Sequence, residues 1–113
     1  MIRRAVFIMA ALAFVAATAS AQDAKLVAKG EQLFAANKCT TCHSVGEKGN
    51  KKGPLDGVGS KYTADEIRDW MLKPAEMAAK HKATRKPMKQ PFTKLAKDDV
   101  DALVAYVQSL KKK

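Results

Sequence analysis

The chain has 113 residues, a formal net charge of +10 at pH 7 and only 6% aromatic residues. This length leaves no room for a second domain, and 47% hydrophobic residues argue against wholesale disorder. An apolar core is marginal in so small a chain, and its two cysteines stand too close together for a disulfide to restrain the fold. We therefore expect a bound group that fills the core.

The first residues have the pattern of a secretory signal peptide. Arg3 and Arg4 precede an uncharged apolar run over residues 5–17, and small residues at positions 19 and 21 suit cleavage before Gln22. The run is shorter than the roughly 20 residues that cross a bilayer, although retention as an N-terminal anchor stays the alternative. We expect a signal peptide over residues 1–21, a mature domain over residues 22–113, and a location in a bacterial periplasm.

Hydrophobic spacing predicts three helices in the mature chain, over about residues 23–37, 63–73 and 98–110. Gly30 in the first of them indicates close approach of another helix. Thr63 and Glu66 form a capping box, and the Lys73-Pro74 pair ends the second helix. No stretch alternates with period two, so the expected fold class is all-α.

Two lysine-rich segments, residues 44–61 and 75–94, separate these helices and are expected to be loops. Loops of this length in a compact domain need something to fold around. The two long segments therefore also indicate a bound group.

Cys39, Cys42 and His43 form the sequence C-x-x-C-H, the attachment signature of a c-type haem. Two thiols on one turn can form thioethers with the two vinyl groups of one porphyrin, and the adjacent histidine then lies beneath the iron. A thiol-redox motif is the first alternative, but it normally accompanies a βαβ pattern that is missing here. A structural zinc site is the second alternative. Its four ligands would have to be Cys39, Cys42, His43 and His81, and the adjacent Cys42 and His43 do not suit tetrahedral coordination.

With these residues in view, the chain resembles a small class I cytochrome c with one haem, over nearly the whole mature part. The resemblance rests on residues 39–43, 53–58, 70–74 and 103–106 and on the Met88 loop. It implies an all-α fold around one covalent haem. The first and last helices would cross at Gly30, with Phe34 and Tyr106 packed near the crossing.

The chain departs from the family's pattern at two places. Leu55 follows Pro54 directly, where the family often has one residue between proline and leucine. Pro87 precedes Met88, where the family usually has proline after the methionine.

His43 is the expected proximal ligand of the haem iron. An imidazole whose other ring nitrogen is held by a carbonyl is a better ligand, and the resemblance nominates the carbonyl of Pro54. Trp70 has two interpretations: it packs against the haem edge with its N–H toward a propionate, or it is a core tryptophan that donates to a backbone carbonyl.

Four residues compete for the sixth coordination position: Met71, Met77, His81 and Met88. Met71 lies on the apolar face of its helix, Met77 follows Pro74 too closely to reach the opposite haem face, and His81 stands among solvated lysines. Met88 lies between two prolines and occupies the family's position. It is the expected ligand, with a gap-filling hydrophobe as the alternative.

Ligation by His43 and Met88 would fill both axial positions and favour outer-sphere electron transfer. No paired carboxylates, activated nucleophile or phosphate loop indicates catalysis, so we expect a carrier with no catalytic residues rather than an enzyme. Two other classes stay open. One is a haem subunit of a periplasmic dehydrogenase or oxidase complex, and the other is a ligand-binding cytochrome with a labile sixth ligand.

Basic residues concentrate in the two segments that should frame the haem. They predict docking to acidic patches on redox partner proteins, against the alternative of a surface kept soluble by charge. We expect a monomer with no nucleic-acid partner and no stable membrane insertion after cleavage, although loose contact with anionic lipid stays open. The residues concerned are Lys38, Lys48, Lys51, Lys52, Lys61, Lys80, Lys82, Arg85, Lys86 and Lys89.

Overall fold

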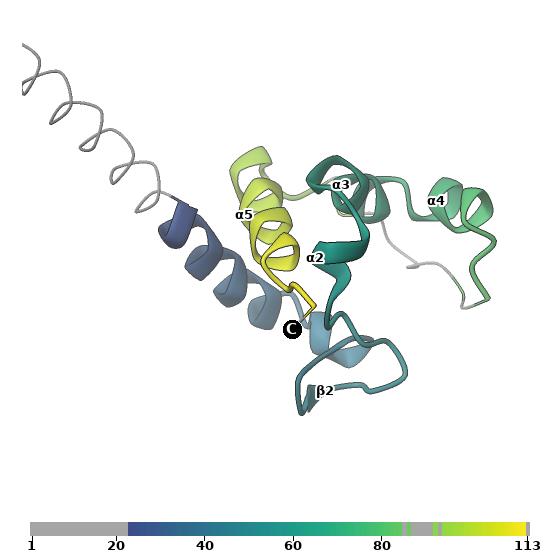
Figure 1. The fold of residues 1–113 in the computed structure, drawn as a ribbon. Helices are drawn as coiled ribbons and strands as arrows, with labels where there is room; N and C mark the ends of the chain where they lie inside the picture. The colour runs from purple at the N-terminus through teal and green to yellow at the C-terminus, as the bar shows by residue number, and fades with distance from the viewer. Residues whose placement is uncertain (1–22, 85, 87–91, 93, 113) are drawn as a thin grey trace, which may run out of the picture.

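The computed structural model describes residues 23–84, 86, 92 and 94–112, and most of these residues are helical (Figure 1). The all-α fold class is therefore confirmed. The predicted signal peptide and Met88 lie outside the described residues. Within the described part, no helix is both long and apolar enough to cross a membrane.

A helix over residues 23–36 comes first, followed by η1 (Cys39–Thr41), β1 (Ser44–Val45), β2 (Lys48–Gly49), α2 (Val58–Lys61), α3 (Ala64–Leu72), α4 (Pro74–Lys80) and α5 (Lys97–Gln108).

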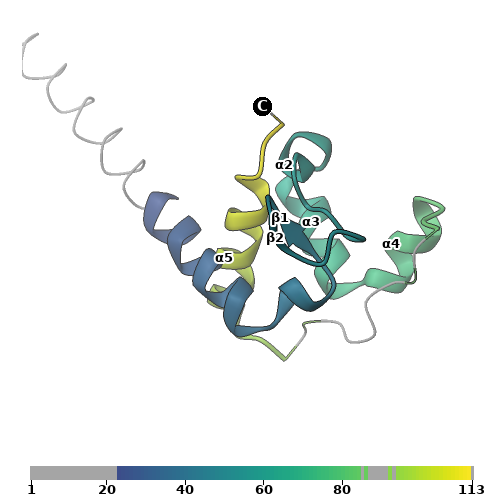
Figure 2. The same ribbon diagram turned by 90° about the horizontal axis from the view of Figure 1, so that it is seen from below.

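The helix over residues 23–36 lies against α5, as both Figure 1 and Figure 2 show. Gly30 is at the crossing: a Cβ atom there would collide with the backbone oxygen of Ala102 and come within 2.6 Å of the Tyr106 Cβ. Only a residue without a side chain allows this approach. The Phe34 and Tyr106 rings pack beside it, with centroids 5.4 Å apart. The expected crossing and its aromatic neighbours are confirmed.

The buried core joins three helices, and α5 supplies most of it. Leu103 is only 2% exposed, and Ala102 beside it is fully buried. The predicted apolar stripe of the last helix is therefore the centre of the fold. The core cluster consists of Phe34, Ile67, Val100, Leu103, Val104, Tyr106 and Val107.

The capping box at the start of α3 forms as predicted. The Glu66 N–H donates to the Thr63 hydroxyl at 3.2 Å, and the Thr63 N–H donates to the Glu66 carboxylate at 3.0 Å. Further along α3, Arg68 forms an ion pair with Asp101 of α5 at 2.8 Å. The hydrogen bond from Arg68, followed by one from Lys97, holds the pKa of the Asp101 carboxyl below its usual value. These contacts fix the orientation of α3 on α5.

The segment expected to be a loop over residues 75–94 begins with a helix instead. Pro74 ends α3 and at the same time occupies the first turn of α4, where its missing N–H and fixed φ cost nothing. Met77 of α4 is only 5% exposed. The expectation of a loop was wrong for residues 75–80, since proline was interpreted only as a terminator.

The segment over residues 44–61 also contains regular structure. β1 and β2 pair antiparallel, Val45 opposite Lys48, and α2 follows after Gly57, which has a left-handed φ of 79°. Two-residue strands are too short to show alternation, which is why the sequence did not indicate them. Within α2, a Cβ atom on Gly59 would collide with the Gln108 backbone, so α2 packs closely against the end of α5.

Candidate haem-attachment site

The C-x-x-C-H motif forms one tight turn after the helix over residues 23–36. Lys38 leaves that helix with a left-handed φ of 58°, and η1 follows. The N–H groups of Cys42 and His43 both donate to the Cys39 carbonyl, at 3.2 and 2.9 Å. Cys39 is half-buried and packs against the core cluster, whereas Cys42 is exposed. A single turn thus carries both thiols and the imidazole.

No disulfide joins Cys39 to Cys42. Burial raises the pKa of the Cys39 thiol, against a smaller lowering by a backbone hydrogen bond. Thiol-redox centres have a lowered pKa, because the thiolate is the nucleophile. The environment of Cys39 therefore does not support the thiol-redox interpretation. Nor does the described part of the chain contain a group of three His, Cys, Asp or Glu side chains placed to bind a metal ion such as zinc.

The imidazole of His43 is oriented by a backbone carbonyl. Its Nδ1 lies 3.0 Å from the carbonyl oxygen of Gly53. A carbonyl can only accept, so Nδ1 carries the proton. This is the tautomer that a metal-ligating histidine requires.

The carbonyl that holds His43 belongs to Gly53 and not to Pro54, which corrects the expectation by one residue. Ser44 and Pro54 form a parallel bridge, in which the Ser44 N–H donates to Gly53 O at 3.1 Å and the Leu55 N–H donates to Ser44 O at 2.9 Å. Consecutive carbonyls of an extended segment point to opposite sides. The register that turns the Gly53 carbonyl toward His43 therefore turns that of Pro54 away.

Asn50 holds the motif from the other side, and the sequence analysis did not identify it. Its N–H lies 3.0 Å from Thr40 O and 3.1 Å from His43 O, and its side-chain amide donates to Thr41 O at 3.1 Å. Gly49 allows this close approach, since a Cβ atom there would collide with the His43 carbonyl. The available signal was the adjacent pair of turn-forming residues, glycine and asparagine.

Trp70 on α3 has a buried polar atom that the described residues leave unsatisfied. Its indole Nε1 has no hydrogen-bond partner among them. A buried donor without an acceptor costs about 1–3 kcal/mol, so an acceptor outside the described residues is expected. Of the two interpretations of Trp70, this geometry favours donation to a bound anionic group over donation to a backbone carbonyl.

The candidates for the sixth ligand occupy different places. Met71 packs on the core cluster, and Met77 is buried on α4. His81 is exposed at the end of α4, but its ring stacks on Trp70 with centroids 5.5 Å apart, so it is not simply solvated. Beyond the segment that contains Met88, the Phe92 N–H donates to Met71 O at 3.1 Å and returns the chain to α3.

A comparison with protein-family models matches residues 27–111 to the family Cytochrome c. The chain belongs to this family. No curated protein and no solved structure matches the chain. Membership implies a covalent c-type haem, and Cys39, Cys42 and His43 fit its attachment motif. This cytochrome c is therefore a haem-binding electron-transfer protein, with a match that spans the motif, Trp70 and the final helix.

Proposed function

We propose that this cytochrome c is a periplasmic carrier of single electrons with His43 and Met88 as the axial ligands of one haem. The observation that carries the proposal is the His43 imidazole, which lies on the same turn as both thiols and is oriented through Nδ1 by the Gly53 carbonyl. When bound, the haem iron supplies a one-electron couple between Fe(III) and Fe(II). The apolar run over residues 5–17 supports export.

Each residue of the site has a separate task. Cys39 and Cys42 hold the porphyrin through thioether bonds. Asn50 and Gly53 keep the turn and the imidazole in place. The Trp70 N–H, which is buried and has no acceptor among the described residues, would donate to a haem propionate. Together these residues would bind and orient the haem.

Met88→Leu tests the proposed ligand set. Leucine has a similar volume and no sulfur, so the ferric protein should lose the weak long-wavelength band of sulfur ligation. The reduction potential should fall by on the order of 100 mV, because a thioether ligand favours Fe(II). Absorption spectra of both oxidation states and a redox titration measure these changes.

Met71→Leu and Met77→Leu are the matched controls, and each should keep the band. Loss of the band in a control, with retention in Met88→Leu, would assign the ligand to that control position. If the wild-type protein is high-spin and binds carbon monoxide at neutral pH, it is a ligand-binding cytochrome and not an electron carrier.

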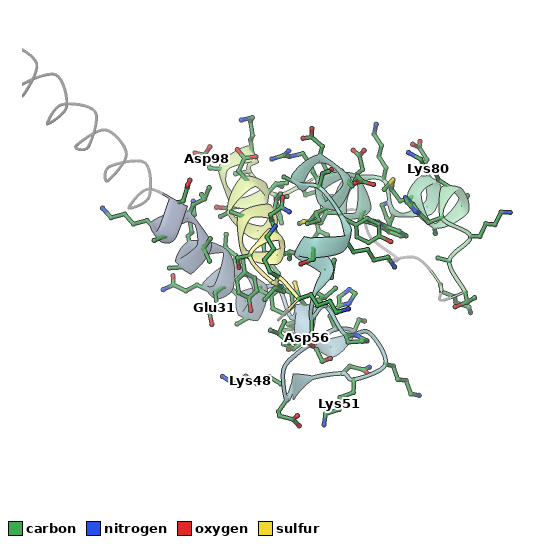
Figure 3. All side chains as sticks on the ribbon, viewed as in Figure 1. Glu31, Lys48, Lys51, Asp56, Lys80 and Asp98 are labelled. Carbon is green, nitrogen blue, oxygen red and sulfur yellow. The ribbon has the colours of Figure 1, made fainter. Side chains whose placement is uncertain are left out.

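We also propose that the lysines around the site guide docking to acidic redox partners. Lys48 lies in β2 of the hairpin after the motif and Lys51 lies just beyond it, whereas Asp98 lies at the start of α5, away from that hairpin (Figure 3). Arg85 and Lys89 are outside the described residues. The described basic residues in this set are all exposed: Lys38, Lys48, Lys51, Lys52, Lys61, Lys80, Lys82 and Lys86.

Reversing the charge of Lys48 and Lys51 together should slow electron exchange with an electrode coated by a carboxylate monolayer. We expect roughly a tenfold loss at low salt, because steering depends on local positive charge. The control is Lys25→Glu with Lys29→Glu, which changes net charge equally on the first helix. Equal losses in both double variants would show that only net charge matters and that the hairpin is not a docking site.

A further inference from the structure

The C-terminal end of the chain is hydrogen-bonded to α2. The side-chain amide of Gln108, the last residue of α5, donates to Gly59 O at 3.1 Å and to Tyr62 O at 3.2 Å. Further along the chain, the Lys111 ammonium donates to Gly59 O at 2.8 Å, and the Gly59 N–H donates to Leu110 O at 2.9 Å. Both backbone groups of Gly59 are therefore bonded to the C-terminal end.

The position of α2 depends on these contacts. The helix has only four residues, and even much longer helices are marginal without tertiary packing. Carbonyls at the C-terminal end of a helix have no donor within the helix, and Gln108 uses both N–H groups of its amide to supply two of them. The contact is also close, because a Cβ atom on Gly59 would collide with the Gln108 carbonyl. Gln108 therefore holds α2 against the end of α5.

The segment that leads into α2 is bonded to the residue after the attachment motif. Val58, the first residue of α2, donates its N–H to Leu55 O at 3.1 Å, and the Leu55 N–H donates to Ser44 O at 2.9 Å. Ser44 follows His43 directly and is only 2% exposed. The Ser44 N–H in turn donates to Gly53 O, the same oxygen that lies 3.0 Å from His43 Nδ1. Continuous contacts thus run from α2 to the imidazole.

A pocket places the C-terminal end beside the same segment (Figure 1). Its lining consists of residues 45–46, 56–57 and 109–112. At this pocket the Gly46 N–H donates to the Asp56 carboxylate at 2.8 Å, and a Cβ atom on Gly57 would lie 3.7 Å from the Lys112 Cα. The segment before α2 is therefore held from one side by residues just after the motif and from the other by the C-terminal end.

We propose that Gln108 is a positioning residue for His43, acting through α2 and the Gly53 carbonyl. The inference rests on the proposed function, in which His43 is the proximal ligand. A hydrogen bond from Nδ1 to a carbonyl makes the imidazole a stronger electron donor, and a stronger donor favours Fe(III) over Fe(II). Loss of the Gln108 contacts should let the Gly53 carbonyl move away from His43, which weakens this hydrogen bond and raises the reduction potential.

Gln108→Met tests the proposal, because it removes both donors and keeps an unbranched side chain of similar length. The haem-loaded variant should have a higher reduction potential than the wild type. Its His43 Nδ1–H proton resonance in the ferrous protein should shift upfield as the hydrogen bond to Gly53 lengthens. Gly59→Ala disturbs the same contact from the α2 side and should shift both readouts in the same direction. Redox titration and proton NMR measure these changes.

Val100→Ala is the control, because it shortens a buried side chain of α5 about two turns from Gln108. It should lower the free energy of unfolding and leave the potential and the resonance at their wild-type values. Unchanged readouts in Gln108→Met, or equal shifts in Val100→Ala, would overturn the positioning role and leave the proposed function intact. A wild-type protein without covalent haem would overturn the proposed function together with the inference.

Discussion

Replacing Cys39 and Cys42 together by serine is expected to give a protein with no covalently bound haem. A hydroxyl does not form the thioether that a thiol forms with a vinyl group, and both thiols stand on the one turn that also presents His43. A chain this small with 6% aromatic residues then lacks the group that completes its core. We expect almost complete loss of haem and of cooperative thermal unfolding.

The measurement is haem content after denaturation and extraction with acidified organic solvent, which removes only non-covalent haem. The control replaces Thr40 and Thr41, the residues between the cysteines, by serine and should retain full haem content. Each single cysteine variant should keep one thioether and an intermediate yield. Haem that withstands extraction from the double cysteine variant would contradict attachment at this motif.

Gly30→Val is expected to destabilise the folded protein by about 3 kcal/mol, at the upper end of the range for overpacked cores. Even the first added carbon would collide with the Ala102 carbonyl oxygen and lie 2.6 Å from the Tyr106 Cβ. Both obstacles belong to α5 and cannot rotate aside, so the two helices must separate. The cost therefore exceeds the small gain in helix propensity from removing glycine.

Thermal and denaturant unfolding of the haem-loaded protein measure this loss. Ala28→Val introduces the same residue on the same helix at an exposed position, and it should change the free energy of unfolding by less than about 1 kcal/mol. Equal stabilities of the two variants would show that the helices do not cross closely at Gly30.

The features that the sequence predicted correctly depend on neighbouring residues. The spacing of Cys39, Cys42 and His43 identified the attachment turn, and the Thr63–Glu66 pair identified the start of α3. The crossing at Gly30 involves distant segments, and it was expected because the chain resembles a family with a known helix arrangement. The predicted signal peptide and the Met88 ligand remain predictions.

The incorrect expectations concern signals with more than one structural meaning. Pro74 ended α3 as expected, but it also began α4, since proline suits the first turn of a helix. The hairpin of β1 and β2 has only two residues in each strand, too few for a periodic pattern. Composition alone assigned both regions to loops.

By itself, the sequence determined the positions of the three longest helices, the attachment motif and the need for a bound group, because periodicity, caps and motif spacing are local properties of the chain. Only the tertiary structure decided that Gly53 rather than Pro54 holds His43, that Asn50 holds the turn, and that His81 stacks on Trp70. Each of these contacts joins residues from different segments. Their geometry depends on strand register and on how α4 lies against α3, which no local pattern encodes.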